Sequence, residues 1–125
     1  MRPLAADEIR GTWGTLLLPI NSVESMDFSR LSDQLEAALD AGVDGMYCNG
    51  TAGEFETLDD AEFEQIALLL ADRCQQRNIP FQIGACATGS RDALRRISQS
   101  KRFHPGAIQV ILPDWRPVSD AEAVG

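Results

Sequence analysis

Two features that the sequence lacks bear on where the protein works. No apolar run approaches the ~20 residues that a membrane-spanning helix needs. Residues 1–10 also lack the apolar segment of a secretory signal. We therefore expect a cytoplasmic protein with no membrane partner.

An excess of basic residues is also missing. The chain has 11 Lys and Arg against 19 Asp and Glu, which gives a net charge of -8 at pH 7. Surfaces that bind nucleic acids or anionic membranes carry a basic patch. We therefore expect no nucleic-acid partner, and we interpret the acidity as an aid to solubility.

Cysteine is scarce, and the three cysteines form no C-x-x-C motif. An odd, unpaired set predicts buried thiols in a reducing compartment rather than a disulfide or a metal site. Four acids near position 60 could also suggest a metal, but the ordinary preference of helix starts for acids accounts for them, so we expect no metal. The residues concerned are Cys48, Cys74, Cys86, Asp59, Asp60, Glu62 and Glu64.

What the sequence does contain is a short apolar run followed by a helical pattern, four times over. The runs are typical of buried strands, and capping residues mark the helix starts. Four such units in 125 residues predict one α/β domain with a parallel sheet. The predicted strands are 12–18, 43–48, 81–85 and 107–112; the predicted helix starts are Asp27, Thr57 or Asp59, Ser90 and Ser119.

The third predicted helix, at about 92–102, has the least distinct buried face. Its apolar residues are only Ala93, Leu94 and Ile97. It also carries five basic residues, which we interpret as a solvated outer face rather than a docking patch. These are Arg91, Arg95, Arg96, Lys101 and Arg102.

A glycine-rich turn, residues 49–55 (NGTAGEF), connects the second predicted strand to the second helix. Glycine permits positive φ and a close approach of the backbone to a ligand. Backbone N–H groups near the following helix start would face negative charge. The turn therefore predicts an anion site, although a plain strand-to-helix turn with no ligand would leave the same pattern.

Several motifs together resemble the dihydrodipicolinate synthase / N-acetylneuraminate lyase family. Residues 50–55 are similar to the family's Gly-Thr/Ser-Thr-Gly-Glu turn, and the other motifs look like its first four strands. The resemblance runs from about residue 11 to residue 117. The motifs are GTWGTLLLP at 11–19, AGVDG at 41–45, QIGA at 82–85 and VILPDW at 110–115.

The residues alone leave two closures of the sheet open, a (β/α)₈ barrel of ~250 residues and a doubly wound sheet. The resemblance implies the barrel, so that residues 1–125 are its N-terminal half, the first four β/α units. A capping box, Ser119 with Glu122, opens a helix that is cut off at Gly125. Half a barrel would leave both sheet edges unpaired.

The resemblance also implies a class I aldolase or lyase that forms a Schiff base between a lysine and pyruvate or another 2-oxo acid, with no cofactor and a homo-oligomeric full-length form. The family's lysine lies on the sixth strand, beyond Gly125. The single lysine here, Lys101, stands beside Arg102 on a polar helix end, so we expect it to be exposed and protonated. Schiff-base chemistry needs a desolvated amine, so we expect these 125 residues to be inactive by themselves.

By resemblance, Thr51 is the catalytic hydroxyl that relays a proton, and Gly50, Thr51, Ala52 and Trp115 bind substrate. Two of these positions depart from the family pattern. Ala52 replaces a threonine that binds the carboxylate, and Trp115 replaces a catalytic tyrosine. Indole only donates a hydrogen bond, so proton relay at 115 would need Asp114 or a water. Glu54 matches a residue expected to bond the turn.

Two other functions remain open from the sequence. The chain could be a non-catalytic fragment or degenerate paralogue that binds a small carboxylate or a partner subunit. It could also be a free-standing doubly wound module that binds phosphate at residues 50–53. His104 has no partner motif, and we expect no catalytic role for it.

Overall fold

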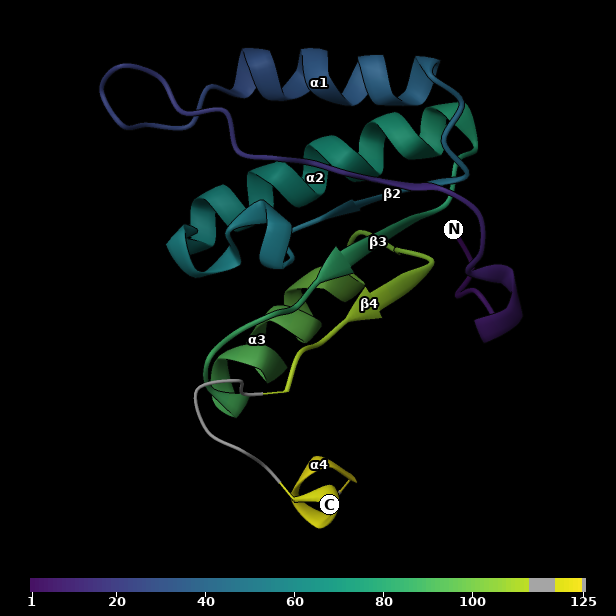
Figure 1. The fold of residues 1–125 in the computed structure, drawn as a ribbon, viewed down its shortest axis with the longest axis vertical. Helices are drawn as coiled ribbons and strands as arrows, with labels where there is room; N and C mark the ends of the chain where they lie inside the picture. Colours follow the sequence, from purple (N-terminus) through teal and green to yellow (C-terminus); the bar gives the residue numbers. More distant parts are fainter. Residues whose placement is uncertain (113–118, 125) are drawn as a thin grey trace.

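The computed structural model describes residues 1–112 and 119–124. Strands and helices alternate along the chain, as predicted (Figure 1). The elements are β1 (Trp13–Thr15), α1 (Phe28–Asp40), β2 (Gly45–Cys48), α2 (Asp60–Arg77), β3 (Phe81–Gly84), α3 (Ser90–Lys101), β4 (Ala107–Gln109) and α4 (Asp120–Val124), with 3₁₀ helices η1 (Ala6–Glu8), η2 (Thr51–Gly53) and η3 (Phe55–Thr57).

The four described strands form one parallel sheet in the order β1-β2-β3-β4. Each strand therefore pairs with the next strand along the chain. A doubly wound sheet reverses its strand order at a switch point, and the described sheet has no reversal. The order rules out the doubly wound alternative for this part of the chain and agrees with the winding of a β/α barrel.

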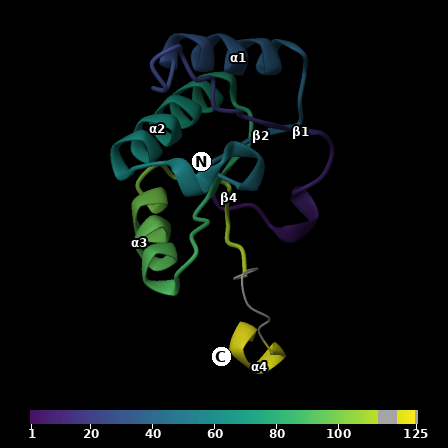
Figure 2. The ribbon, with the colours of Figure 1, turned by 60° about the vertical axis from the view of Figure 1, so that its left-hand side comes forward.

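Helices α1, α2 and α3 lie along one side of the sheet (Figure 2). Asp27 accepts a hydrogen bond from the Arg30 amide at 3.0 Å and caps α1, while Asp59 and Glu62 form a capping box at α2. The buried faces of α1 and α2 pack on the sheet as their spacing predicts. The core contains Leu31, Leu35, Leu39, Phe63, Ile66, Ala67, Leu70 and Cys74 from the helices and Met46, Cys48, Phe81 and Ile83 from the strands.

The outermost described strands are shorter than the apolar runs predicted. Only Trp13–Thr15 of run 12–18 and Ala107–Gln109 of run 107–112 are paired, because each of these strands has a single described neighbour. Beyond them Leu17, Val110 and Leu112 are each more than half exposed. These exposed apolar residues follow the carboxyl ends of β1 and β4, the two outermost described strands.

Helix α3 differs most from its prediction. Its N-cap is Gly89, not Ser90, and it has no side-chain cap. Its buried residues are Arg96 and Ser100, whereas Leu94 is 64% exposed. The prediction of a solvated outer face was therefore wrong for Arg96, because hydrogen bonds across the fold engage the two terminal nitrogens of its guanidinium, as described below.

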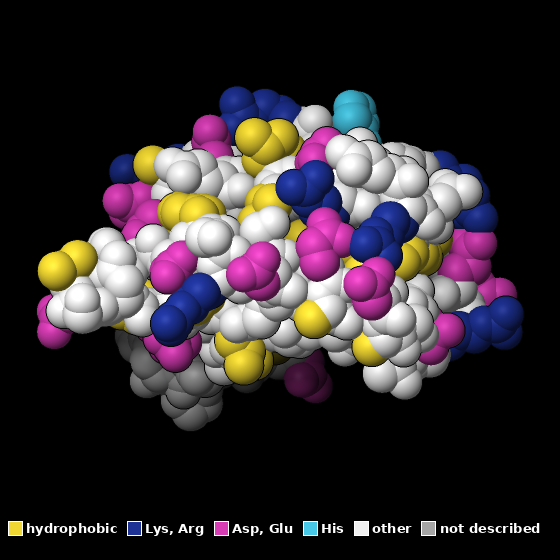
Figure 3. All heavy atoms as spheres, turned by 90° about the horizontal axis from the view of Figure 1, so that it is seen from above, with side chains coloured by type: hydrophobic (Ala, Val, Ile, Leu, Met, Phe, Trp, Pro, Cys, Tyr) yellow, Lys and Arg dark blue, Asp and Glu magenta, His cyan; other side chains and the backbone are white. Residues whose placement is uncertain are grey.

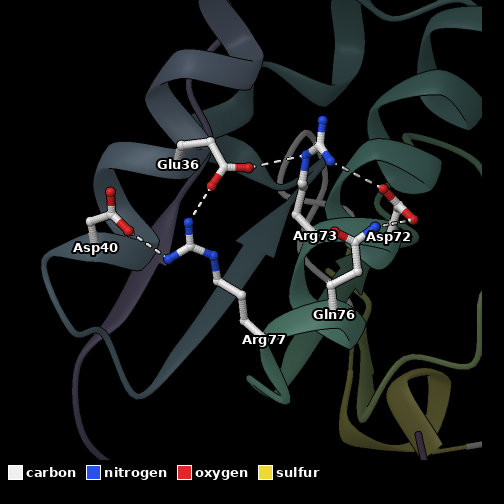
Figure 4. Close-up of polar contacts among 6 residues, drawn as sticks. All are labelled: Glu36, Asp40, Asp72, Arg73, Gln76 and Arg77. Carbon is white, nitrogen blue, oxygen red and sulfur yellow. Dashed lines mark hydrogen bonds and ion pairs between the residues drawn. The ribbon is translucent and has the colours of Figure 1, made fainter.

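Ion pairs join α1 to α2 at the ends of the helices away from the carboxyl ends of the strands (Figure 4). Glu36 contacts both Arg73, at 3.1 Å, and Arg77, while Asp40 contacts Arg77 and Asp72 contacts Arg73. The face that carries α1 shows acidic and basic side chains interspersed (Figure 3). At this end of a β/α unit such contacts serve stability rather than chemistry.

The predicted capping box at the last helix is confirmed. The Ser119 amide donates to Glu122 Oε2 at 3.0 Å, and the Glu122 amide donates to Ser119 Oγ at 3.4 Å. None of the described helices is both long enough and apolar enough to cross a bilayer.

Candidate functional site

The turn between β2 and α2 lies at the carboxyl ends of the strands, where parallel β/α proteins place their sites. Asn49 and Glu54, with φ of 58° and 47°, supply its left-handed positions. Gly50 has φ of -101°, which any residue can adopt. The turn therefore does not use the freedom of Gly50 to adopt positive φ, because Asn49 and Glu54 adopt that conformation instead.

Close packing requires the first turn glycine, Gly50, and leaves little room at the second, Gly53. A Cβ built on Gly50 would lie 1.5 Å from the Tyr47 hydroxyl oxygen. A Cβ on Gly53 would lie 3.2 Å from the Leu16 carbonyl oxygen. The turn thus packs directly on β2 and on the segment after β1, and this contact fixes its place at the sheet edge.

The turn leaves two amides for a ligand. The Gly50 carbonyl accepts from the amides of Gly53, at 3.0 Å, and Phe55, at 3.3 Å, and the Thr51 carbonyl accepts from Glu54 at 3.1 Å. Within the described residues, the amides of Thr51 and Ala52 donate no hydrogen bond, and both residues are exposed. Two amides without a partner, in exposed residues and beside the Thr51 hydroxyl, suit a carboxylate or another small anion.

Glu54 contributes to the turn through its backbone. Its carbonyl accepts from both the amide and the Oγ1 of Thr57, each at 2.9 Å. Its side chain is exposed. The expectation that Glu54 bonds the turn is therefore confirmed for the main chain only.

Buried polar groups surround the turn on the sheet side. Asn49 is 1% exposed, and its Nδ2 donates to the Phe63 carbonyl at 3.3 Å. The Tyr47 hydroxyl is also buried and faces the Cys86 thiol. Burial raises the pKa of both Tyr47 and Cys86, so each stays protonated at neutral pH and neither supplies a ready base or nucleophile.

Arg96 of α3 donates hydrogen bonds to backbone carbonyls at the end of the turn and beside it. Its Nη1 donates to the carbonyls of Cys86, at 2.6 Å, and Phe55, at 3.2 Å, and its Nη2 donates to Leu58 at 3.2 Å. The guanidinium also lies 5.1 Å from the centre of the Phe63 ring. Sequence reasoning missed this residue, although its spacing from Ala93 and Ser100 places it on the inner face of the helix.

The other candidate side chains lie away from the turn or cannot be placed. Lys101 is exposed at the last position of α3, the end remote from the carboxyl end of β3. His104 is exposed. Trp115 and Asp114 lie outside the described residues. Of the predicted site residues, the structure therefore places Gly50, Thr51 and Ala52 in the turn, and the role of Trp115 stays a prediction.

The three cysteines are buried, as predicted. Three acids of the predicted cluster at the start of α2 have structural partners. Asp59 and Glu62 cap the helix, and Asp60 forms an ion pair with Arg95. Arg95 lowers the pKa of Asp60 through this contact. In the described part of the chain, no three His, Cys, Asp or Glu side chains are grouped as metal ligands would be.

Comparisons with known proteins agree with this arrangement. The model of the Dihydrodipicolinate synthetase family matches residues 8–123. The N-acetylneuraminate lyase of Enterobacter sp. (strain 638) is 25% identical over 118 residues, which are 94% of this chain and 39% of that protein. This chain therefore spans about 39% of the length of the curated relatives it matches.

Two solved structures share the fold. YagE, a prophage protein of the dihydrodipicolinic acid synthase family from E. coli K12, was solved in complex with pyruvate; it has a TM-score of 0.81 and 25% identity over 91% of this chain and 38% of its own. CdNal from Clostridium difficile, in complex with mannosamine, has a TM-score of 0.82 and 19% identity over 91% of this chain and 39% of its own. At 19% identity the second likeness shows the fold alone.

Proposed function

Because the chain belongs to the dihydrodipicolinate synthetase family and corresponds to the N-terminal portion of its members, we propose that the turn at 50–53 binds the carboxylate of a 2-oxo acid such as pyruvate. The observation that carries this proposal is the pair of amides at Thr51 and Ala52, two exposed residues, that donate no hydrogen bond within the described part of the chain. The pyruvate complex of YagE, a relative at 25% identity, supports the choice of ligand.

The three turn residues have different roles in this proposal. Gly50 lets the backbone pack on Tyr47 and so sets the direction of the two amides that follow. Thr51 adds a hydroxyl that binds the acid and relays a proton to the reacting centre. Ala52 supplies only its amide, and one hydrogen bond to a charged group is worth about 1.5–3 kcal/mol, so we expect weak carboxylate binding.

The reaction proposed for the full-length protein is Schiff-base chemistry on a 2-oxo acid, with the lysine on a strand beyond Gly125. Trp115 would contact substrate from the end of the fourth unit, and the full-length protein would form a homo-oligomer. Lys101 does not fit the lysine's role because it is exposed at the far end of α3. Schiff-base chemistry needs a desolvated amine, which an exposed position does not provide.

Pyruvate titration of the ¹⁵N-labelled chain, followed by amide chemical shifts, tests the binding site. We expect the largest shifts at Thr51 and Ala52. Ala52→Thr restores a hydroxyl and should tighten binding about tenfold or more, and Thr51→Val should weaken it by a similar factor. Ala61→Thr, at an exposed alanine of α2, is the matched control and should change nothing. Equal effects of Ala52→Thr and Ala61→Thr would contradict the proposed site.

A second function is a non-catalytic carboxylate or subunit binder, and the exposure of Lys101 favours it for the 125-residue chain alone. Borohydride reduction in the presence of pyruvate separates the two functions. We expect no mass increase on the 125-residue chain, and an adduct on a later lysine in any longer form. An adduct on Lys101 would show that the reactive amine has been misplaced.

A further inference from the structure

Arg96 is a buried cation that forms no ion pair with a carboxylate within the described residues. It is 7% exposed. The nearby acids Asp60 and Asp92 both pair with Arg95 instead. Its charge is met by three carbonyl oxygens and the face of the Phe63 ring. A buried charge without an acid is costly unless its donors are well used, so a role beyond packing is expected for it.

The three carbonyls belong to two segments that meet at the site. Phe55 is the first residue of η3, at the end of the turn, Leu58 directly follows η3, and Cys86 follows β3. The turn's own hydrogen bonds span only a few residues, from Gly50 to Thr57. Arg96 thus provides its anchor across the fold, joining positions 41 and 38 residues away in sequence.

The shape of the guanidinium suits this task. Its planar fork reaches several carbonyls at once, whereas the ammonium of lysine is a compact point charge. On the opposite side of the turn, Asn49 donates to the Phe63 carbonyl. Arg96 and Asn49 therefore hold the turn from its two ends, and both contact Phe63 of α2.

We propose that Arg96 is a positioning residue for the anion site: it fixes the segment from Phe55 to Leu58 against the end of β3, and so holds the amides of Thr51 and Ala52 in place for a carboxylate. The identity of the ligand rests on the proposed function, but the ordering of the turn does not.

Amide hydrogen exchange of the 125-residue chain tests the ordering. In Arg96→Met, we expect the amides of Gly53 and Phe55 to exchange at least about tenfold faster, because their anchor is lost. Core amides of α1 should change much less. Arg91→Met, at an exposed arginine of the same helix, is the matched control and should leave both regions unchanged.

Arg96→Lys keeps the charge and serves as the conservative variant. We expect exchange at the turn to lie between those of the wild type and Arg96→Met, and if Arg96→Met does not fold, this variant decides the outcome. An acceleration that is equal at the turn and in α1 would show that Arg96 acts only on global stability. Unchanged exchange at the turn would overturn the proposal outright.

A pyruvate titration of the same variants separates this inference from the proposed function. If the wild-type chain binds pyruvate, Arg96→Met should bind it at least about tenfold more weakly, with partial recovery in Arg96→Lys. If the wild type does not bind pyruvate, the proposed ligand is wrong while the exchange result still decides the role of Arg96. Faster exchange with unchanged pyruvate affinity would refute the link between the anchor and the site.

Discussion

Replacing Gly50 by alanine should distort the turn, and the cause can be isolated with Tyr47. The added Cβ would lie 1.5 Å from the Tyr47 hydroxyl oxygen and 2.1 Å from Cζ. These distances are far inside van der Waals contact, so the ring or the turn must move. Overpacking of this kind costs about 1–3 kcal/mol of folding free energy, and we expect the upper part of that range.

A double-mutant cycle of Gly50→Ala and Tyr47→Ala measures this strain as a coupling free energy. Tyr47→Ala alone should cost about 2 kcal/mol, less than a fully buried aromatic, because the ring is half-buried. It removes the three atoms nearest to the new Cβ, so Gly50→Ala/Tyr47→Ala should be about as stable as Tyr47→Ala alone. The coupling free energy would then be about 2–3 kcal/mol in favour of the double mutant. Tyr47→Phe should relieve the strain only in part, because Cζ remains.

Urea denaturation followed by far-ultraviolet circular dichroism measures these free energies, provided that the slope with urea is unchanged among variants. Gly89→Ala is the matched control, since a Cβ there meets nothing within 4 Å. We expect it to cost less than about 1 kcal/mol. If Gly50→Ala and Tyr47→Ala are additive within about 0.5 kcal/mol, the packing explanation for Gly50 is refuted.

Two further predictions concern stability. Burial raises the pKa of Cys74 to about 12, so its contribution to stability is complete below pH ~8.5 and is lost as the pH rises towards 12; Cys74→Ala should make this part of the stability profile less steep without flattening it, because burial also raises the pKa of Tyr47, Cys48 and Cys86, and a thiol reagent should not react with the folded chain at pH 8. Glu36→Gln weakens its ion pairs with Arg73 and Arg77 and should lower Tm at low salt, with the difference shrinking in about 1 M NaCl, where the Debye length is only about 3 Å; a difference independent of salt would contradict an electrostatic cause.

The helices were predictable because their signals are local. Asp27 caps α1 and Asp59 caps α2 within the turn that each begins, and the apolar spacing that follows needs no knowledge of the rest of the fold. The turn at 50–53 was also found from a local signal, the short motif at residues 50–55. The alternation of strands and helices then predicted a parallel sheet, which the register confirms.

The features that sequence reasoning missed depend on contacts between distant segments. Gly50 is required by the ring of Tyr47, and only the path of the turn over β2 reveals this contact. In the sequence Arg96 resembles an ordinary surface charge, and only the fold shows that it donates hydrogen bonds to the carbonyls of Phe55, Leu58 and Cys86. The predicted strands were too long because an apolar run only suggests where a strand lies. A residue belongs to the strand only where its backbone pairs with a neighbouring strand, and the ends of the first and fourth runs have no such partner among the described residues.

A crystal structure of the chain soaked with pyruvate would test the central claim most directly, since the claim concerns the placement of one carboxylate. We predict a carboxylate oxygen about 2.7–3.2 Å from the amide nitrogens of Thr51 and Ala52, with the Thr51 hydroxyl also in contact. Pyruvate bound elsewhere, with both amides facing only solvent, would contradict the account.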